Sequence, residues 1–143
     1  MIKSVFLRNE ILYNQYLELR WLLLRKPLGG IRGSEVDSME SESFHKAAFD
    51  SNGNMIGVGR IHFIGNIAQI RYMAMIKQFR SKGFGSKLIT ELEKIAVEND
   101  MKKIFLNSRI SAVDFYLKNG YQKIKKVNPS FGDIIHYRME KIL

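Results

Sequence analysis

The stretch that decides the fold reads Gln78-Phe79-Arg80-Ser81-Lys82-Gly83-Phe84-Gly85-Ser86-Lys87. It stands between an apolar run typical of a strand and an amphipathic run typical of a helix. Gly83 and Gly85 carry no side chain that would keep a ligand away from the main chain. The first amides of the following helix have no partner inside the helix, and the helix dipole adds partial positive charge there. The stretch therefore predicts a site that holds an anion, such as the phosphate groups of a cofactor.

Two common phosphate-binding patterns do not fit this spacing. A nucleoside-triphosphate P-loop has lysine after its last glycine, whereas Ser86 follows Gly85 here. A dinucleotide fingerprint, G-x-G-x-x-G, would need a third glycine where Leu88 stands. What remains is the pattern R-x-x-G-x-G from Arg80 to Gly85.

Length and composition indicate a soluble globular protein. The chain has 143 residues, of which 45% are hydrophobic and 26% are charged, so it can bury a core and is not of the disordered type. We expect residues 1–143 to form a single domain. The longest apolar stretch, residues 21–24, is too short to span a membrane, and no signal-peptide segment begins the chain. A cytoplasmic location is the expectation.

Cysteine and histidine usage argues against a metal site. The chain has no cysteine, which excludes disulfides, thiolate zinc sites and a cysteine nucleophile. The three histidines, His45, His62 and His136, are far apart and lack the spacing of metal ligands. We expect no metal.

The charge distribution predicts the kind of partner. A net charge of +9 favours an anionic partner, either a phosphorylated cofactor or a nucleic acid. The segment Ser34-Glu35-Val36-Asp37 concentrates acid in an otherwise basic chain. Glu35 and Asp37 are therefore candidate ligands of a cationic substrate, with a solvated turn as the equally weighted alternative.

Hydrophobic periodicity and turn residues predict the order of the elements. We expect strands at 2–7, 44–49, 55–63, 67–76, 103–107, 121–127 and 134–139, and helices at 9–25, 83–99 and 111–119. Ser111 and Asp114 form a capping-box pattern at the start of the last helix. In the strand at 67–76, alternate residues from Ala68 to Ile76 form one apolar face. This order predicts an α/β fold with a mixed sheet covered by helices on both faces.

Four segments in this order resemble the GCN5-related N-acetyltransferase (GNAT) family. Arg80 to Gly85 resembles its coenzyme A pyrophosphate loop, and the strand 73–76 leads into that loop as in the family. Residues 112–121, Ala-Val-Asp-Phe-Tyr-Leu-Lys-Asn-Gly-Tyr, resemble the signature A-x-x-F-Y-x-x-x-G-[FY], and residues 134–139 resemble the final strand of several members. The resemblance covers the chain from residue 67 onward. It implies an α/β (α+β) fold with a twisted, mostly antiparallel sheet of six to seven strands.

The resemblance also implies an activity, the transfer of an acyl group from acetyl-CoA to an amine. The residues implied to contact coenzyme A are Met75, Ile76, Arg80, Ser81, Lys82, Gly83, Phe84, Gly85, Ser86, Asn107 and Tyr116. The amide of Met75 would face the thioester carbonyl. Tyr116 would act as the general acid that protonates the departing thiolate.

Two parts of the site stay open at this stage. Arg109 stands where many family members have the asparagine that binds the cofactor arm, and Asn107 is the substitute contact. The candidates for the general base are Glu35, Asp37, His62 and His136, with a water chain as the alternative.

Two other functions are weighed beside the enzyme. The first is a module that senses acyl-CoA without turnover. The second is a basic nucleic-acid-binding domain, which is disfavoured because most aromatic residues fall on apolar stripes rather than among the basic residues. The sequence is compatible with a small-molecule or a protein acceptor and with a homodimer.

Overall fold

The computed structural model describes residues 1–129 and 131–143, and it confirms the expected mixed sheet. The sheet has seven strands in the order β1-β2-β3-β4-β5-β7-β6. All neighbouring strands are antiparallel except β4 and β5. The strands are β1 (Ile2–Val5), β2 (Phe44–Phe49), β3 (Met55–Ile64), β4 (Ile67–Met75), β5 (Lys103–Arg109), β6 (Gln122–Val127) and β7 (His136–Ile142).

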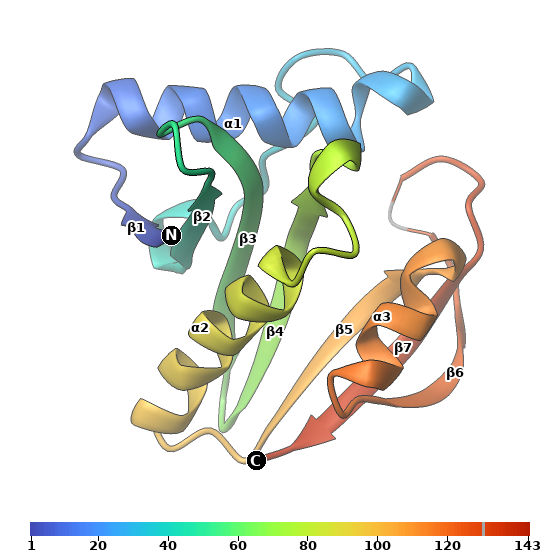
Figure 1. Cartoon of the computed structure of the whole chain (residues 1–143). Helices are drawn as coiled ribbons and strands as arrows, with labels where there is room; N and C mark the ends of the chain where they lie inside the picture. The colour runs from blue at the N-terminus through green and yellow to red at the C-terminus, as the bar shows by residue number, and fades with distance from the viewer. Residues whose placement is uncertain (130) are drawn as a thin grey trace.

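Helices cover both faces of this sheet, as expected (Figure 1). They are α1 (Glu10–Leu24), α2 (Phe84–Glu98) and α3 (Val113–Lys118). α1 packs on one face through Tyr16, which lies among Ala47 and Val58. α2 and α3 pack on the other face, where Leu92 and Tyr116 belong to one buried cluster. None of the described helices is long and apolar enough to cross a membrane.

The first two helices begin and end close to where their residues predict. Asn9 caps α1, because its side-chain oxygen accepts a hydrogen bond of 3.2 Å from the amide of Leu12. Pro27 is the second residue of the short 3-10 turn Lys26–Leu28 that follows α1. The apolar stripe of α2 is fully buried at Leu88, Ile89, Leu92 and Ala96. Each buried leucine or isoleucine of such a stripe stabilises the fold by about 1.5–3 kcal/mol.

The capping box predicted for the third helix is wrong. Residues Ile110–Ala112 form a 3-10 turn, and α3 begins only at Val113. Ser111 therefore lies inside a turn rather than at the extended position that a capping residue occupies. Among the described residues, no side chain caps α3.

A β-bulge in β4 overturns the predicted continuous apolar face. Val58 pairs with Ala74, but Arg60 pairs with Arg71, so Tyr72 and Met73 together oppose the single residue Gly59. Tyr72 has a φ of 56°, a left-handed conformation that is rare for an aromatic residue.

The bulge changes which face each side chain occupies. Ala68 and Ile70 belong to the cluster against α2, as predicted. Ala74 instead packs beside Tyr16 of α1, and Met75 packs beside Leu88 of α2. The extra residue has therefore reversed the alternation at the end of β4.

β4 and β5 separate at their carboxyl ends. Their parallel pairing is confined to Ile67–Gln69 against Lys103–Phe105. Beyond these residues the two strands diverge (Figure 1). The main chain of β4 from about residue 70 onward is therefore not covered by a neighbouring strand on the β5 side.

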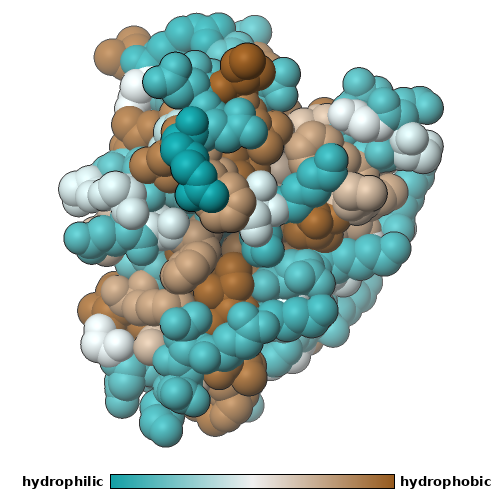
Figure 2. Space-filling view, turned by 90° about the vertical axis from the view of Figure 1, so that its left-hand side faces the viewer, coloured by the Kyte–Doolittle hydropathy of each residue, from teal (hydrophilic) through white to brown (hydrophobic). Residues whose placement is uncertain are grey.

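The two edges of the sheet are formed by short or strongly charged strands. β6 is exposed along most of its length and contains Lys123, Lys125 and Lys126, which discourages pairing with another sheet edge. On the side of the molecule that carries β1, hydrophobic and hydrophilic residues are interspersed (Figure 2).

Candidate active site

The glycine loop leaves a row of main-chain donors unpaired. None of the amides from Ser81 to Ser86 donates a hydrogen bond to an acceptor in the described part of the chain. Ser81 and Gly83 both have left-handed backbone conformations, with φ of 61° and 88°. Gly83 is the N-terminal cap of α2, so these amides gather at the positive end of the helix dipole. The arrangement fits a diphosphate.

The two glycines of the loop do different things. A Cβ atom added at Gly83 would have no described neighbour within 4 Å outside its own chain neighbours, so that position opens onto the space beside the loop. A Cβ atom added at Gly85 would lie 3.0 Å from the ring of Phe115. Gly85 therefore allows α2 to approach α3, a role that the spacing of the motif does not reveal.

The main chain of Met75 faces the opening between β4 and β5. The amide of Ile76 donates to the carbonyl of Ile56 in β3, at 2.8 Å. Because hydrogen bonding alternates along antiparallel strands, the amide of Met75 points away from β3. The carbonyl of Met75 also points away, since it accepts a hydrogen bond of 3.1 Å from Nε of Arg80.

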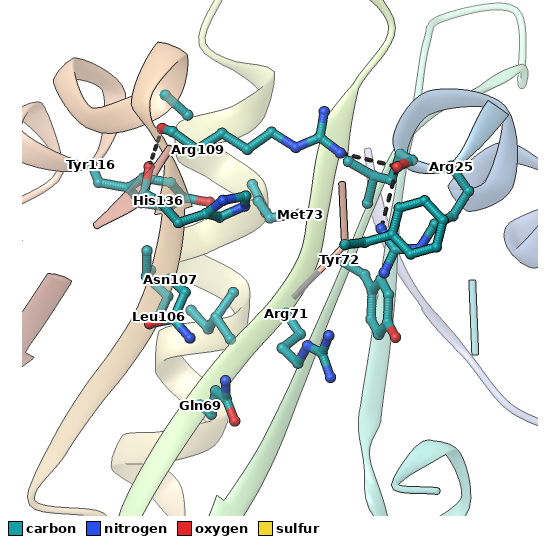
Figure 3. Close-up of a pocket in the computed structure, with 15 residues that line it drawn as sticks. Arg25, Gln69, Arg71, Tyr72, Met73, Leu106, Asn107, Arg109, Tyr116 and His136 are labelled. Atoms are coloured by element: carbon teal, nitrogen blue, oxygen red, sulfur yellow. Dashed lines mark hydrogen bonds between the residues drawn. The ribbon is translucent and has the colours of Figure 1, made fainter. Parts of the chain in front are cut away.

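A cavity of about 280 Å³ lies at the opening between the two strands. Figure 3 shows side chains of β4 and β5 on either side of it, with Arg25 at the end of α1 closing another side. Its lining residues are Leu24, Arg25, Gln69, Ile70, Arg71, Tyr72, Met73, Leu106, Asn107, Ser108, Arg109, Ala112, Tyr116, Phe131 and His136.

The structure brings only some of the predicted residues to this cavity. Asn107 and Tyr116 line it, whereas Met75 and the loop residues 80–86 do not. In the sequence the loop follows the end of β4, whose earlier residues line the cavity. Met73 lines the cavity two residues before Met75. The site thus has two parts, the loop and the cavity, with the end of β4 between them.

Tyr116 is buried in an aromatic group. Its ring centre lies 5.0 Å from that of Phe115 and 5.7 Å from that of Tyr121. Burial raises the pKa of the Tyr116 phenol above its ordinary value. The phenol therefore stays protonated throughout the neutral pH range and is available as a proton donor.

Arg109 extends across the cavity from β5 to the end of α1 (Figure 3). Its Nη2 donates a hydrogen bond of 3.0 Å to the carbonyl oxygen of Leu24. Burial lowers the pKa of this guanidinium, and the positive charges of Arg25 and Arg80 lower it further. Asn107, the other residue considered for the cofactor arm, also lies on β5 and is exposed.

The two predicted substrate carboxylates do not line the cavity. Asp37 accepts hydrogen bonds from Arg60 at 2.6 and 3.0 Å and from Arg71 at 2.8 Å. Burial opposes ionisation of Asp37, but the hydrogen bonds and charges of these arginines outweigh it and hold its pKa well below the usual range. The side chain of Glu35 accepts a hydrogen bond of 2.6 Å from the amide of Gly33. Their predicted role stays a prediction.

The two histidines considered as bases lie in different surroundings. His136 lines the cavity, with Nδ1 2.7 Å from the carbonyl oxygen of Ile134. His62 is buried, with Nδ1 3.2 Å from Nη2 of Arg60. Burial lowers the pKa of His62, and the charge of Arg60 lowers it further.

A buried polar network under α1 was not expected from the sequence. Arg20 and Arg60 are both fully buried, and each forms an ion pair with Glu40, at 2.8 and 2.6 Å. Ring nitrogens of His45 lie 3.0 Å from Oη of Tyr16 and 2.8 Å from the carbonyl oxygen of Glu40. Burial lowers the pKa of His45.

Stability should therefore fall as the pH drops below neutral. His45 and His62 have lowered pKa values in the folded chain, while unfolded histidine titrates near about 6.5. Below that pH the unfolded chain binds more protons, so acid favours unfolding. We expect a lower urea midpoint at pH 5.5 than at pH 7.5, and a smaller difference for His45→Gln. An equal or higher midpoint at pH 5.5 would show that these histidines are not held neutral.

The residues that sequence reasoning missed are mainly arginines and aromatics around the cavity. Arg25 was expected only as the last residue of a helix, and Arg71 only as part of the strand at 67–76. Tyr72 was assigned to an apolar face, and Phe131 was not considered. No local motif marks these residues, because the fold brings them together from three separate segments.

Comparison with known proteins identifies the family. Residues 34–143 match the model of the acetyltransferase (GNAT) domain. The uncharacterized N-acetyltransferase YjcF of Bacillus subtilis is 27% identical over 140 residues, which cover 98% of this chain and 99% of that protein. The chain belongs to the GNAT acetyltransferase family and is an N-acetyltransferase.

Solved structures of low sequence identity share the fold. An aminoglycoside 6'-N-acetyltransferase complexed with coenzyme A superposes with a TM-score of 0.81 at 18% identity, covering 99% of this chain and 96% of that one. Escherichia coli ElaA superposes with a TM-score of 0.80 at 16% identity, covering 99% of each chain. No group of three or more potential metal-ligating His, Cys, Asp or Glu side chains occurs among residues 1–129 and 131–143.

Proposed function

We propose that this protein transfers an acetyl group from acetyl-CoA to a primary amine, which attacks the thioester directly. The observation that carries the proposal is the row of unpaired amides from Ser81 to Ser86 at the start of α2. It lies beside a β4 end whose main chain faces an uncovered opening. A diphosphate at the loop would place the arm of the cofactor along this opening, toward the cavity.

The loop residues would hold the donor mainly through their main chain. Amides from Ser81 to Ser86 would donate to the diphosphate oxygens, and the side chain of Lys82 would add positive charge. Arg80 acts differently, because its Nε is bound to the carbonyl of Met75. Arg80 thereby fixes the end of β4 relative to the loop. Ile76, before the loop, and Phe84, within it, are further proposed contacts of the cofactor.

The main chain of Met75 would stabilise the negative charge that develops on the thioester oxygen. Its amide points away from β3, so it is available to a ligand. Main-chain donors fixed in this way need no reorganisation during the reaction. Acetyl-CoA supplies an activated acyl group and a thiol leaving group.

Tyr116 would donate the proton that the leaving thiolate takes up. A thiol has a pKa near about 8.5 and departs tolerably without help, so the proton assists but is not indispensable. We expect Tyr116→Phe to lower kcat by about 10²-fold or somewhat less, with little change in KM for acetyl-CoA. Steady-state rates of thiol release at saturating amine measure this. An unaltered rate would remove Tyr116 from the mechanism.

Turnover separates this proposal from the alternatives weighed on the sequence. A sensor module would bind coenzyme A without acetylating any amine in a broad panel. A nucleic-acid-binding domain would retain RNA or DNA in a salt-sensitive manner. The single domain at 1–143, the cytoplasmic location and the formation of a homodimer stay predictions.

A further inference from the structure

The cavity beside Tyr116 is lined by positive charge without a carboxylate. Arg25, Arg71 and Arg109 all contribute to its wall. No aspartate or glutamate is among its described lining residues. With a volume of about 280 Å³ it is the size of a small-molecule site rather than a protein groove.

Two of these guanidiniums converge on one neutral atom. Nη1 of Arg25 lies 3.2 Å and Nη2 of Arg109 lies 3.0 Å from the carbonyl oxygen of Leu24, as Figure 3 shows by dashed lines. Neither arginine forms an ion pair with a carboxylate in the described residues. Two like charges held together away from water are unfavourable unless an anion joins them.

The third guanidinium is only partly neutralised. Arg71 is paired with Asp37 at 2.8 Å, but Asp37 also accepts two hydrogen bonds from Arg60. The ring of Tyr72 lies 4.7 Å from the guanidinium of Arg71 and 5.5 Å from that of Arg25. A tyrosine ring offers a weak attraction to cations and no full negative charge.

The arginines line a different space from the loop whose amides would hold the donor. None of the residues 80–86 lines the cavity. The cavity wall is completed by Arg25 at the end of α1 and by Phe131 and His136 near the end of the chain. Tyr116, which would lie next to the reacting thiol, is part of the same wall. The cavity is therefore the place for the acceptor amine rather than for the diphosphate.

We propose that the acceptor carries a carboxylate, which Arg25 and Arg109 bind while Arg71 adds its charge. The substrate class is then a small amine with an acidic group, such as an amino acid, rather than a polyamine or an aminoglycoside. This inference rests on the proposed acetyl transfer. It departs from the expectation that Glu35 and Asp37 select a cationic substrate, because neither of these residues lines the cavity. The planar fork of arginine matches a carboxylate with two parallel hydrogen bonds.

The test compares amines that carry a carboxylate with amines that lack it. Each amino acid of a broad panel is assayed beside its own carboxamide, with spermidine and kanamycin as cationic amines, by the release of free thiol from acetyl-CoA. We expect the best amino acid to exceed its carboxamide in kcat/KM by at least about tenfold, because a hydrogen bond to a charged group is lost in the amide. A preference for the carboxamides or for the cationic amines would overturn the inference and leave the acetyl transfer standing.

A matched pair of variants tests whether Arg25 causes the preference for the carboxylate. Arg25→Gln should raise KM for the preferred amino acid by about 10- to 100-fold. It should leave KM for the matching carboxamide and the calorimetric affinity for coenzyme A nearly unchanged. Arg8→Gln is the control, since Arg8 is exposed and does not line the cavity. An equal rise in KM for the amino acid and for its carboxamide, or a loss of coenzyme A binding, would contradict the role of Arg25 in binding the carboxylate.

A binding measurement decides the inference even without turnover. If no amine is acetylated, the proposed function fails. Calorimetry with the N-acetylated panel, in the presence of coenzyme A, then compares each acid with its carboxamide on the wild-type protein. We expect at least one acid to bind about tenfold more tightly than its amide. The absence of any such pair would overturn the anionic site.

Discussion

Gly83→Glu should abolish coenzyme A binding while the protein stays folded. Apart from its own chain neighbours, no described residue comes within 4 Å of a Cβ atom added at residue 83, so the position has room for a side chain to begin. Its carboxylate would stand where the diphosphate is proposed to bind, and like charges at close range repel. We expect the dissociation constant for coenzyme A to rise more than about 100-fold, which corresponds to about 2.7 kcal/mol. Isothermal calorimetry measures it.

The chain offers a closely matched control for this variant. Gly53 has a φ of 80°, close to the 88° of Gly83, and a Cβ atom added there likewise has no described neighbour within 4 Å outside its own chain neighbours. Gly53→Glu therefore introduces the same charge and the same backbone strain at the tip of a hairpin. It should bind coenzyme A as the wild type does. Equal affinities for the two variants would refute the assignment of the loop.

Arg60→Met should cause the largest loss of stability. The side chain of Arg60 is fully buried and pairs with Asp37 and Glu40, both at 2.6 Å. Methionine fills a similar space but leaves those carboxylates with fewer partners in a buried region. Removing one partner of a buried ion pair costs about 3–5 kcal/mol. We expect the lower end of this range, because Arg71 and Arg20 still pair with the two carboxylates.

Urea unfolding checks this prediction against an exposed ion pair. Arg32 pairs with Glu18, and its side chain is 62% exposed. Arg32→Met should change the free energy of unfolding by less than about 1 kcal/mol. If Arg60→Met were no more destabilising than Arg32→Met, the buried network would not hold α1 against the sheet.

The sequence predicts the elements well where one local rule decides the outcome. The stripe from Leu88 to Ala96 predicts α2 because only a helix places these residues on one face. The glycine loop is likewise recognisable, since its spacing excludes the other phosphate-binding patterns. Asn9 marks the start of α1 through a hydrogen bond within one turn. Each of these features depends on residues that are close in the chain.

The features that the sequence hides depend on pairing between distant segments. The bulge at Tyr72 and Met73 arises because two residues oppose Gly59 of another strand. Alternation alone therefore placed Ala74 on the wrong face. The capping box was predicted wrongly for a similar reason. β5 continues to Arg109, and Ser111 lies in the 3-10 turn that follows.

The candidate site likewise has parts that the sequence predicts and parts that it hides. The loop and Tyr116 were recognised from motifs, but the arginines of the cavity lie just after α1, in β4 and in β5, and have no common motif. Glu35 and Asp37 were prominent because acid is scarce in this basic chain. In the structure, Asp37 accepts hydrogen bonds from Arg60 and Arg71, and Glu35 accepts one from the amide of Gly33. A count of local charge does not reveal such pairing.

The most direct test of the account is a titration of the isotope-labelled protein with coenzyme A, followed by ¹H–¹⁵N NMR. If main-chain amides hold the diphosphate, the largest shifts will fall on Ser81 to Ser86, with downfield movement of protons that become hydrogen-bonded, and a further shift will fall on the amide of Met75. If coenzyme A binds while the amides of Ser81 to Ser86 keep their positions, the central claim is wrong.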